Sequence, residues 1–304
     1  MTSSSDSLHT KDGQPVVSVI IPILNAEKFL AEAIECVIAQ TYPFWELLLV
    51  EDGSTDGSPG IAKRYARDWP SKIRYFEHPG HENRGMTESR NLGQRNSRGR
   101  YIARLDADDV LGPTTFEDQV RILEAHPDAA LVYGPVQIWN TWTGDPGAAD
   151  ATQEYTSAVP LNTVIPPPLA MLAFLSNEQN EAVGVFVRRE AIEEVGGYEE
   201  VGGYTDEAAF YEDIALNVKL FLRYPVIAWD RNWYRYRQHP DSLCSVMRAR
   251  KTFDAGRLRF LEWVGKYFAE VGMKDPKIWA VHQKALEQQL EFVRAGNPSS
   301  LSAG

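Results

Sequence analysis

The sequence predicts an α/β fold with a mostly parallel central sheet flanked by helices, followed by a smaller mixed lobe and C-terminal helices. Three observations predict it. Short β-branched runs alternate with helical patterns up to about residue 135, the pattern becomes irregular after about residue 140, and apolar residues return at helical spacing in the last fifty residues. Strands that alternate with helices imply parallel strands joined by right-handed crossovers.

The first half of the chain supplies five predicted strands and the helices between them. Each predicted strand is an apolar run bounded by turn residues: 16–24, 47–50, 73–76, 101–105 and 130–133. Apolar residues three and four apart predict helices over 29–38, 86–95 and 113–125, and another that begins near Ser58 with Pro59 at its first position.

The second half is less regular. We expect a loop over 144–156, a short helix over Leu169–Leu175, a strand over 182–187, a helix over 207–224, and aromatic strands over 226–229 and 233–236. The residues after 245 read as helices. Because no linker separates two independent halves, we expect one compact unit with two lobes, preceded by a disordered tail over 1–14.

The charge balance excludes several classes of partner. Lys and Arg total 31 and Asp and Glu total 42, which gives a net charge of -11 over 304 residues. Nucleic-acid affinity comes largely from basic side chains, so we expect no nucleic-acid partner. The longest apolar runs are shorter than the roughly 18 residues of a membrane helix, and two distant cysteines, Cys36 and Cys244, favour a reducing compartment. We predict a cytoplasmic protein without an integral membrane segment, and leave peripheral membrane attachment and a homodimer open.

Two acid-rich loops follow predicted strands. Ligands of open parallel sheets bind beyond the carboxyl ends of the strands, which is where Asp106 and Asp108 lie. Two carboxylates of this kind suit Mg²⁺ or Mn²⁺ with substrate phosphates completing the shell, although a bare DxD is more often an acidic turn. Asp52, after the second strand, could accept a hydrogen bond from a nucleobase N–H, or simply belong to a turn.

Other candidates lie on helices and in a late loop. Gly85, at a helix entrance, would allow close approach of an anion, and Arg90 could pair with a carboxylate or phosphate. Glu212 and Asp213 are adjacent on a helix and point about 100° apart, so only one need enter a cleft as a general base. His239 could complete a metal shell with Asp108. For each, the plainer alternative is a solvated surface residue.

Together these residues resemble the family 2 glycosyltransferases, which have the GT-A fold. The resemblance covers roughly residues 15–245 and depends on the order and spacing of several motifs. They are VSVIIPILN at 17–25, QTY at 40–42, ELLLVEDGSTD at 46–56, NRGMTESRNLG at 83–93, GRYIARLDADD at 99–109 and RREAIEEVGGY at 188–198, with Glu212-Asp213 downstream. Glu51 and Ser89 stand where the family usually has Asp and Ala, and the QxxRW motif of processive synthases is absent.

The resemblance implies an enzyme that transfers a hexose-type sugar, with inversion and without processivity, from a nucleotide diphosphate-sugar to an acceptor hydroxyl. A UDP-sugar is the favoured donor, and glycan, polysaccharide or cell-wall biosynthesis is the expected setting. The acceptor, whether a glycan, a lipid-linked sugar or a small molecule, is not disclosed. The chain divides into a nucleotide-sugar-binding half over 15–135, an acceptor-binding half over 136–245 and C-terminal helices over 246–304.

The resemblance also implies roles for individual residues. Asp213 would be the catalytic base, supported by Glu212, and Asp108 with His239 would hold Mn²⁺ or Mg²⁺. Asp52 would contact the nucleobase. The remaining donor-side residues would be Pro22, Asn25, Glu27, Gly85, Arg90 and Asp106, and aromatic candidates for acceptor stacking are Trp229, Trp233 and Tyr234.

Two alternatives stay open. A nucleotidyltransferase would use similar carboxylate–metal chemistry, but it would normally carry a Gly-rich loop with basic residues near the first strand, and 21–25 (IPILN) has none. A non-catalytic nucleotide-sugar-binding module on a GT-A scaffold is disfavoured by the intact Asp106, Asp108 and Asp213, and donor hydrolysis would decide it.

Overall fold

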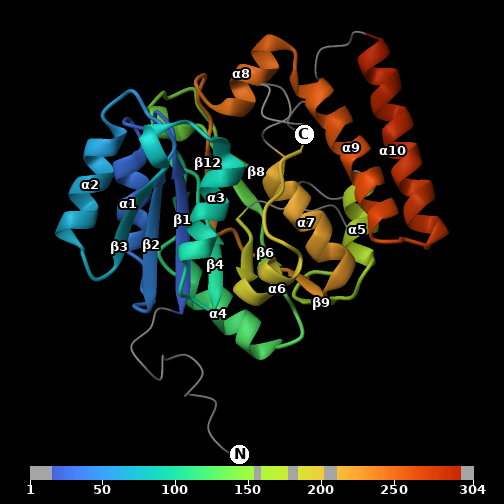
Figure 1. Ribbon diagram of the computed structural model, residues 1–304, viewed down its shortest axis with the longest axis horizontal. Helices are drawn as coiled ribbons and strands as arrows, with labels where there is room; N and C mark the ends of the chain where they lie inside the picture. The colour runs from blue at the N-terminus through green and yellow to red at the C-terminus, as the bar shows by residue number, and fades with distance from the viewer. Residues whose placement is uncertain (1–15, 154–158, 177–183, 202–210, 296–304) are drawn as a thin grey trace, which may run out of the picture.

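The computed structural model describes residues 16–153, 159–176, 184–201 and 211–295 (Figure 1). The predicted tail over 1–14, the start of the predicted strand at 182 and the start of the predicted helix at 207 lie outside these residues. The first half contains the elements that the sequence predicts, with ends shifted by a few residues. They are β1 (Val17–Ile23), α1 (Leu30–Ile38), β2 (Trp45–Glu51), α2 (Ser58–Asp68), β3 (Ile73–Glu77), α3 (Gly85–Asn96), β4 (Tyr101–Arg104), α4 (Thr115–Ala125) and β6 (Leu131–Tyr133).

The second half combines short strands with helices. Its predicted elements are α5 (Leu169–Leu175), β10 (Phe186–Arg188), α7 (Glu212–Arg223), β11 (Val226–Ala228), β12 (Tyr234–Arg237), α9 (Phe253–Glu270) and α10 (Pro276–Arg294), with α8 (Leu243–Arg250) before the last two. The structure adds elements that the sequence did not predict. These are β5 (Val110–Leu111), β7 (Val136–Trp139), β8 (Ala151–Gln153), β9 (Thr163–Ile165), α6 (Arg189–Glu194) and the 3₁₀ turns η2 (Pro79–His81) and η3 (Thr141–Thr143).

A sheet of eight strands, in the order β3-β2-β1-β4-β10-β6-β11-β9, forms the centre of the molecule. β1 pairs in parallel with β2 and β4, and β2 pairs in parallel with β3. β10 enters antiparallel between β4 and β6, and β9 closes the edge antiparallel to β11. The prediction of a mostly parallel sheet is therefore confirmed. The sheet continues across residue 135, so the two predicted halves share it, and the division there stays a prediction.

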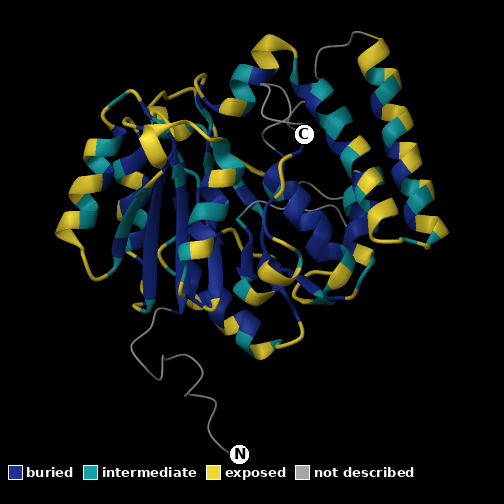
Figure 2. Ribbon diagram, in the orientation of Figure 1, coloured by how far each residue is buried: buried dark blue, intermediate teal, exposed yellow. Residues whose placement is uncertain are grey.

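Alternate residues of the strands fill two apolar layers, one on each face of the sheet. Val19, Ile21 and Ile23 of β1 belong to the layer that includes the buried side chains of α1 and α4. Ile20 and the neighbouring strands' Val50 and Ile102 belong to the other layer, which reaches α7 and α9. Figure 2 shows the strands buried between helices that expose only their outer sides. Helices α9 and α10 pack beside α5 and α7, at the end of the molecule away from β3 (Figure 1).

A second sheet of four strands, in the order β5-β12-β7-β8, lies next to the first. Its pairing of β12 with β5 places residues that follow β11 directly against the loop that follows β4. The two sheets thus bring the acid-rich loop at 106–109 next to a segment more than one hundred residues later in the chain.

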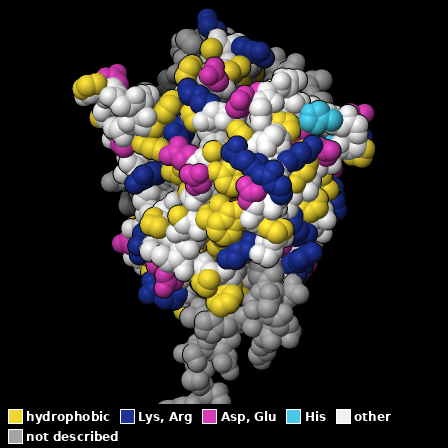
Figure 3. Space-filling view, turned by 90° about the vertical axis from the view of Figure 1, so that its left-hand side faces the viewer, with side chains coloured by type: hydrophobic (Ala, Val, Ile, Leu, Met, Phe, Trp, Pro, Cys, Tyr) yellow, Lys and Arg dark blue, Asp and Glu magenta, His cyan; other side chains and the backbone are white. Residues whose placement is uncertain are grey.

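The surface on the side of α2 carries both signs of charge. Figure 3 shows Lys and Arg side chains beside Asp and Glu on this face, around exposed apolar atoms. Lys63 lies 3.3 Å from Glu77, and Arg67 lies 2.9 Å from Asp68. In the part of the chain that the structure describes, no helix has both the length and the apolar character needed to span a bilayer.

Candidate functional site

The carboxyl ends of β1 and β2 are joined by a network between two loops. The backbone N–H of Asn25 donates to the hydroxyl of Ser54, and the Asn25 side-chain oxygen accepts from the N–H of Thr55 at 2.8 Å. The Glu27 N–H donates to Asp56, while the Glu27 carboxylate accepts from the Gly57 N–H. The structure therefore brings Asn25 and Glu27 to the predicted edge, where both side chains organise the second loop.

Asp52 lies at the end of β2 and is almost fully buried. One carboxylate oxygen, Oδ1, accepts from the backbone N–H of Arg84 at 2.7 Å and of Gly85 at 3.2 Å. These are donors at the start of α3, which have no partner within the helix, so Asp52 caps α3 from a neighbouring strand. Burial raises the pKa of Asp52, against these hydrogen bonds and the nearby His78. Pro22 lies half-buried in β1, and β1 pairs with β2 directly beside Asp52.

The approach of the 82–83 backbone to this loop requires a glycine. Gly53 has φ +83°, in the left-handed region, and a Cβ placed on it would lie 2.7 Å from the backbone nitrogen of Asn83. No larger side chain fits there. The same approach positions Gly85, with φ +84°, against Asp52, so the helix entrance predicted from the sequence is held by the carboxylate.

Arg90 of α3 joins the two halves of the candidate site. Its Nη2 donates to Asp106 Oδ1 at 2.8 Å, and its Nε lies 3.1 Å from Glu212 Oε1. The Arg90 and Glu212 side chains are 5% and 2% exposed, so this ion pair is removed from water. Burial raises the pKa of Glu212 to about 7; Arg90 opposes the shift and the charge of Asp213 adds to it.

Asp213, the next residue, faces a different direction. Its side chain is 23% exposed, and one carboxylate oxygen lies 3.8 Å from Arg104 Nη1. The same nitrogen donates to the Asp213 carbonyl at 3.1 Å, and Arg104 Nη2 donates to Asn217 Oδ1 at 3.2 Å. Arg104 therefore fixes the first turn of α7 against β4. The structure confirms the helical geometry expected for the pair, with one acid buried and the other partly open.

Asp108 and His239 lie side by side. His239 Nε2 is 2.9 Å from Asp108 Oδ2, while its other ring nitrogen is buried with no hydrogen-bond partner among the described residues. Phe29 packs against the imidazole with 4.7 Å between ring centroids. Oxygen and imidazole nitrogen together form a donor set that Mn²⁺ accepts well and that Mg²⁺, which prefers oxygen alone, accepts less well. These two residues thus fit a divalent metal ion.

A second group brings three potential metal ligands together. Carboxylate oxygens of Glu51 and Glu77 and a ring nitrogen of His81 lie within 4.8 Å of one another. Glu51, however, accepts from the N–H groups of Gly53 and Ser54, and the second His81 nitrogen lies 3.0 Å from the Ser54 carbonyl. Because Glu51 and His81 already make these contacts, the group serves to hold the loop after β2 in place.

The aromatic candidates for acceptor binding are mostly internal. Trp233 is buried and its indole N–H donates to Asp118 at 3.2 Å. Tyr234 is buried as well, and its hydroxyl donates to Asp109 at 2.7 Å. Trp229 is half-buried against the apolar layer of α1 and α4. Acceptor binding by these residues stays a prediction. The polar atoms of Trp233 and Tyr234 already bond to Asp118 and Asp109, which argues against it for these two.

Three further residues organise the site and were not singled out from the sequence. Asp109 is buried and accepts from the Arg237 N–H at 2.8 Å; burial, and then the charges of Asp108 and Asp106, raise its pKa well above the ordinary value. Arg237 donates through Nε to the Asp108 carbonyl at 2.6 Å. Arg104 is the third. The sequence did contain a signal for Arg104, because it is a charged residue inside the apolar run YIARL.

Comparison with known sequences identifies the family. Glycosyl transferase family 2 matches residues 18–195, which is more than half of the chain. The chain belongs to this family. The family resemblance predicted from the motifs is thus confirmed, and the matched residues include every donor-side candidate named above.

Similar proteins were found among curated sequences and among solved structures. A putative glycosyltransferase of Bacillus subtilis, EpsE, is 43% identical over 112 residues, which span 37% of this chain and 40% of EpsE. S. aureus TarS 1-349 in complex with UDP-GlcNAc has a TM-score of 0.58 at 15% identity and covers 92% of each chain. The mannosyltransferase PcManGT of Pyrobaculum calidifontis, in complex with GDP-Man and Mn2+, has a TM-score of 0.56 at 19% identity and covers 95% of this chain and 77% of its own. These structures support the GT-A fold.

Proposed function

We propose that this chain transfers a sugar from a nucleotide diphosphate-sugar to an acceptor hydroxyl, with a UDP-sugar as the favoured donor. Family membership supports the reaction class. Two fold neighbours that were solved with UDP-GlcNAc and with GDP-Man support a donor of this type. The acceptor in glycan, polysaccharide or cell-wall biosynthesis, the non-processive mode and the residue roles remain predictions.

The observation that carries the proposal is the difference in burial between the adjacent acids Glu212 and Asp213. Glu212 is buried and paired with Arg90, so it holds α7 to the Asp106 loop. Asp213 is the more exposed acid and its main chain is fixed by Arg104. We assign Asp213 as the general base. It would accept the proton of the acceptor hydroxyl as that oxygen attacks the anomeric carbon opposite the departing diphosphate, with inversion.

Asp108 and His239 would hold the divalent ion, and Mn²⁺ suits their oxygen and nitrogen donors better than Mg²⁺ does. When bound, the ion would offset the negative charge that grows on the diphosphate. The chain itself places carboxylates at this edge, in Asp52, Asp106, Asp108 and Asp213, so we expect weak binding of an anionic donor without a cation.

The remaining donor-side residues would shape the nucleotide pocket. Asp52 accepts from the α3 N–H groups through Oδ1, and the Ser89 side chain also bonds to this carboxylate; we propose that its remaining acceptor capacity receives the nucleobase N–H. Pro22, Asn25 and Glu27 would line the pocket from β1 and the loop after it. Gly85 and Arg90 would lie on the diphosphate or sugar side, where Arg90 orients Asp106.

A thermal-shift screen tests the proposal. The protein is heated with UDP-, GDP- and dTDP-sugars, each with and without Mn²⁺, because a ligand that binds only the folded state raises its apparent stability. We expect stabilisation by one donor family, strongest with Mn²⁺. Stabilisation only by a nucleoside triphosphate with a sugar 1-phosphate would favour the nucleotidyltransferase instead. Binding without release of nucleoside diphosphate in a coupled assay would favour a non-catalytic module.

A further inference from the structure

Two buried oxygens beside Arg90 have no hydrogen-bond partner among the described residues: the hydroxyl of Tyr198 and Oε2 of Glu212. Tyr198 is 4% exposed and Glu212 is 1% exposed. Buried polar atoms in folded proteins almost always have a partner, so two unpaired oxygens next to one ion pair call for a functional explanation. Each oxygen could be satisfied by a ligand that brings its own hydroxyl groups.

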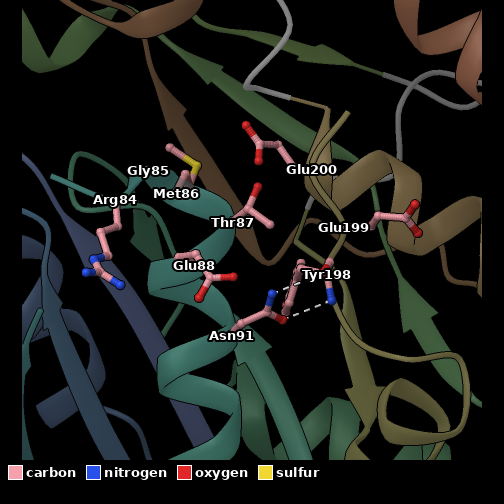
Figure 4. Close-up of a pocket in the computed structure, with 9 residues that line it drawn as sticks. All are labelled: Arg84, Gly85, Met86, Thr87, Glu88, Asn91, Tyr198, Glu199 and Glu200. Carbon is pink, nitrogen blue, oxygen red and sulfur yellow. Dashed lines mark hydrogen bonds between the residues drawn. The ribbon is translucent and has the colours of Figure 1, made fainter. Parts of the chain in front are cut away.

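The structure fixes Tyr198 through its backbone, and its hydroxyl takes no part in that attachment. Asn91 of α3 donates from Nδ2 to the Tyr198 carbonyl at 3.0 Å, and its Oδ1 accepts from the Tyr198 N–H at 3.1 Å (Figure 4). The preceding Gly197 has φ +76°, and a Cβ placed on it would lie 3.1 Å from the same Asn91 oxygen. The turn is therefore held closely against the helix that carries Arg90.

The charges around the ring belong to the proposed catalytic cluster. The Arg90 guanidinium carbon lies 5.9 Å from the centre of the Tyr198 ring. Burial raises the pKa of Tyr198, against the charges of Arg104 and Arg90, and the charges of Asp213 and Glu212 add to the rise. The phenol therefore keeps its proton at neutral pH and remains a hydrogen-bond donor.

Tyr198 also borders a pocket of about 220 Å³ between the start of α3 and the 198–200 turn (Figure 4). Arg84, Thr87 and Glu88 line it from the α3 side, and Glu199 and Glu200 line it from the turn. Glu88 and Glu200 point carboxylates toward this space in Figure 4. Carboxylates accept hydrogen bonds from hydroxyl groups and repel phosphate, so the pocket suits a hydroxyl-rich neutral ligand.

We propose that Tyr198 is a sugar-binding residue whose hydroxyl donates a hydrogen bond to a sugar oxygen in this pocket. The inference rests on the proposed glycosyl transfer and deepens it, because it names a residue that recognises the sugar and not the nucleotide. The sugar belongs either to the donor or to the acceptor, and both present the same hydroxyl chemistry.

Tyr198→Phe tests this inference because it removes only the unpaired hydroxyl. This hydroxyl has no hydrogen-bond partner among the residues that the structure describes, so the melting temperature should stay equal or rise. UDP affinity, measured by calorimetry with Mn²⁺, should be unchanged. Turnover at low substrate should fall about tenfold, typical of one hydrogen bond lost to a substrate. Tyr224→Phe is the matched control, since its hydroxyl donates to Glu194 at 2.6 Å on an exposed surface.

Two assays separate the sources of the sugar. Hydrolysis of UDP-GlcNAc, or of the donor chosen by the thermal-shift screen, involves the donor sugar alone, and transfer to a mixture of methyl glycosides adds an acceptor sugar. A loss in either assay supports the inference. Unchanged turnover in both, or a loss that follows a lower melting temperature and weaker UDP binding, overturns it. Absence of turnover by the wild-type protein with every donor would refute the proposed function and this inference together.

Discussion

Replacing Glu212 by glutamine should change how the stability of the protein depends on pH. The Glu212 carboxyl is buried beside Arg90, and its pKa is raised from 4.5 to about 7, chiefly by burial and further by the charge of Asp213, against Arg90. In the unfolded chain the carboxyl is solvated and has its ordinary pKa. The folded protein therefore holds a proton between these two values that the unfolded chain releases.

The direction and the size of the pH effect on stability follow from this difference between the folded and unfolded pKa of Glu212. Between pH 4.5 and about 7 the folded state binds more protons, so its stability falls as pH rises, and the contribution is constant above and below this window. Because the pKa rises from 4.5 to about 7, and one pKa unit corresponds to about 1.36 kcal/mol, this contribution amounts to about 3 kcal/mol. Glutamine has the same shape and does not titrate, so this contribution should disappear in Glu212→Gln.

Urea unfolding at a series of pH values from 4.5 to 8 measures the effect. The stability of the wild-type protein relative to Glu212→Gln should fall by about 3 kcal/mol across the window. Buried acids that do not interact with Glu212, such as Asp109, are present in both proteins and cancel in the difference. The exposed Glu190, replaced in the same way, should follow the wild type. A Glu212→Gln protein with the same pH dependence as the wild type would refute the reasoning.

Three more perturbations separate the proposed roles. Asp213→Asn should lower turnover by about 10²–10⁴-fold in a nucleoside-diphosphate release assay, with donor affinity nearly unchanged by calorimetry, because only the base is lost; full activity would exclude the assignment. Asp108→Ala should abolish the dependence of nucleotide binding on Mn²⁺ in paired calorimetric titrations, and a persistent dependence would place the ion elsewhere. Arg90→Ala should destabilise the protein in urea by about 3–5 kcal/mol, since Glu212 loses its buried partner; Arg95→Ala, at an exposed site on the same helix, should not, and equal losses would contradict the account.

The regular half of the fold could be predicted because its strands are buried on both faces. A run such as VVSVIIPIL at 16–24 is apolar at nearly every position, and few other structures accommodate it. The short strands β5, β7, β8 and β9 could not be predicted, since their pairing partners, not their own residues, define them. The antiparallel pairing of β10 with β4 and β6 is likewise set by the tertiary fold and not by the local sequence of β10.

The acids of the candidate site were visible in the sequence, but their partners were not. Asp109 accepts hydrogen bonds from Tyr234 and Arg237, which follow it by more than one hundred residues in the chain. No local sequence pattern links these residues. Asp52 shows the same limit: its place after a strand was predicted, while its contact with the first N–H groups of α3 depends on the fold. Asp213 could not be ranked above Glu212 from adjacency alone, and exposure distinguishes them.

The stereochemistry of donor cleavage tests the central claim most directly. The wild-type protein is incubated with Mn²⁺ and α-linked UDP-GlcNAc, and in parallel with GDP- and dTDP-sugars, and ¹H NMR follows the released sugar before it mutarotates. We expect release of nucleoside diphosphate together with the β anomer first, and loss of both in Asp213→Asn. Initial appearance of the α anomer, release undiminished in Asp213→Asn, or no release from any donor would contradict it.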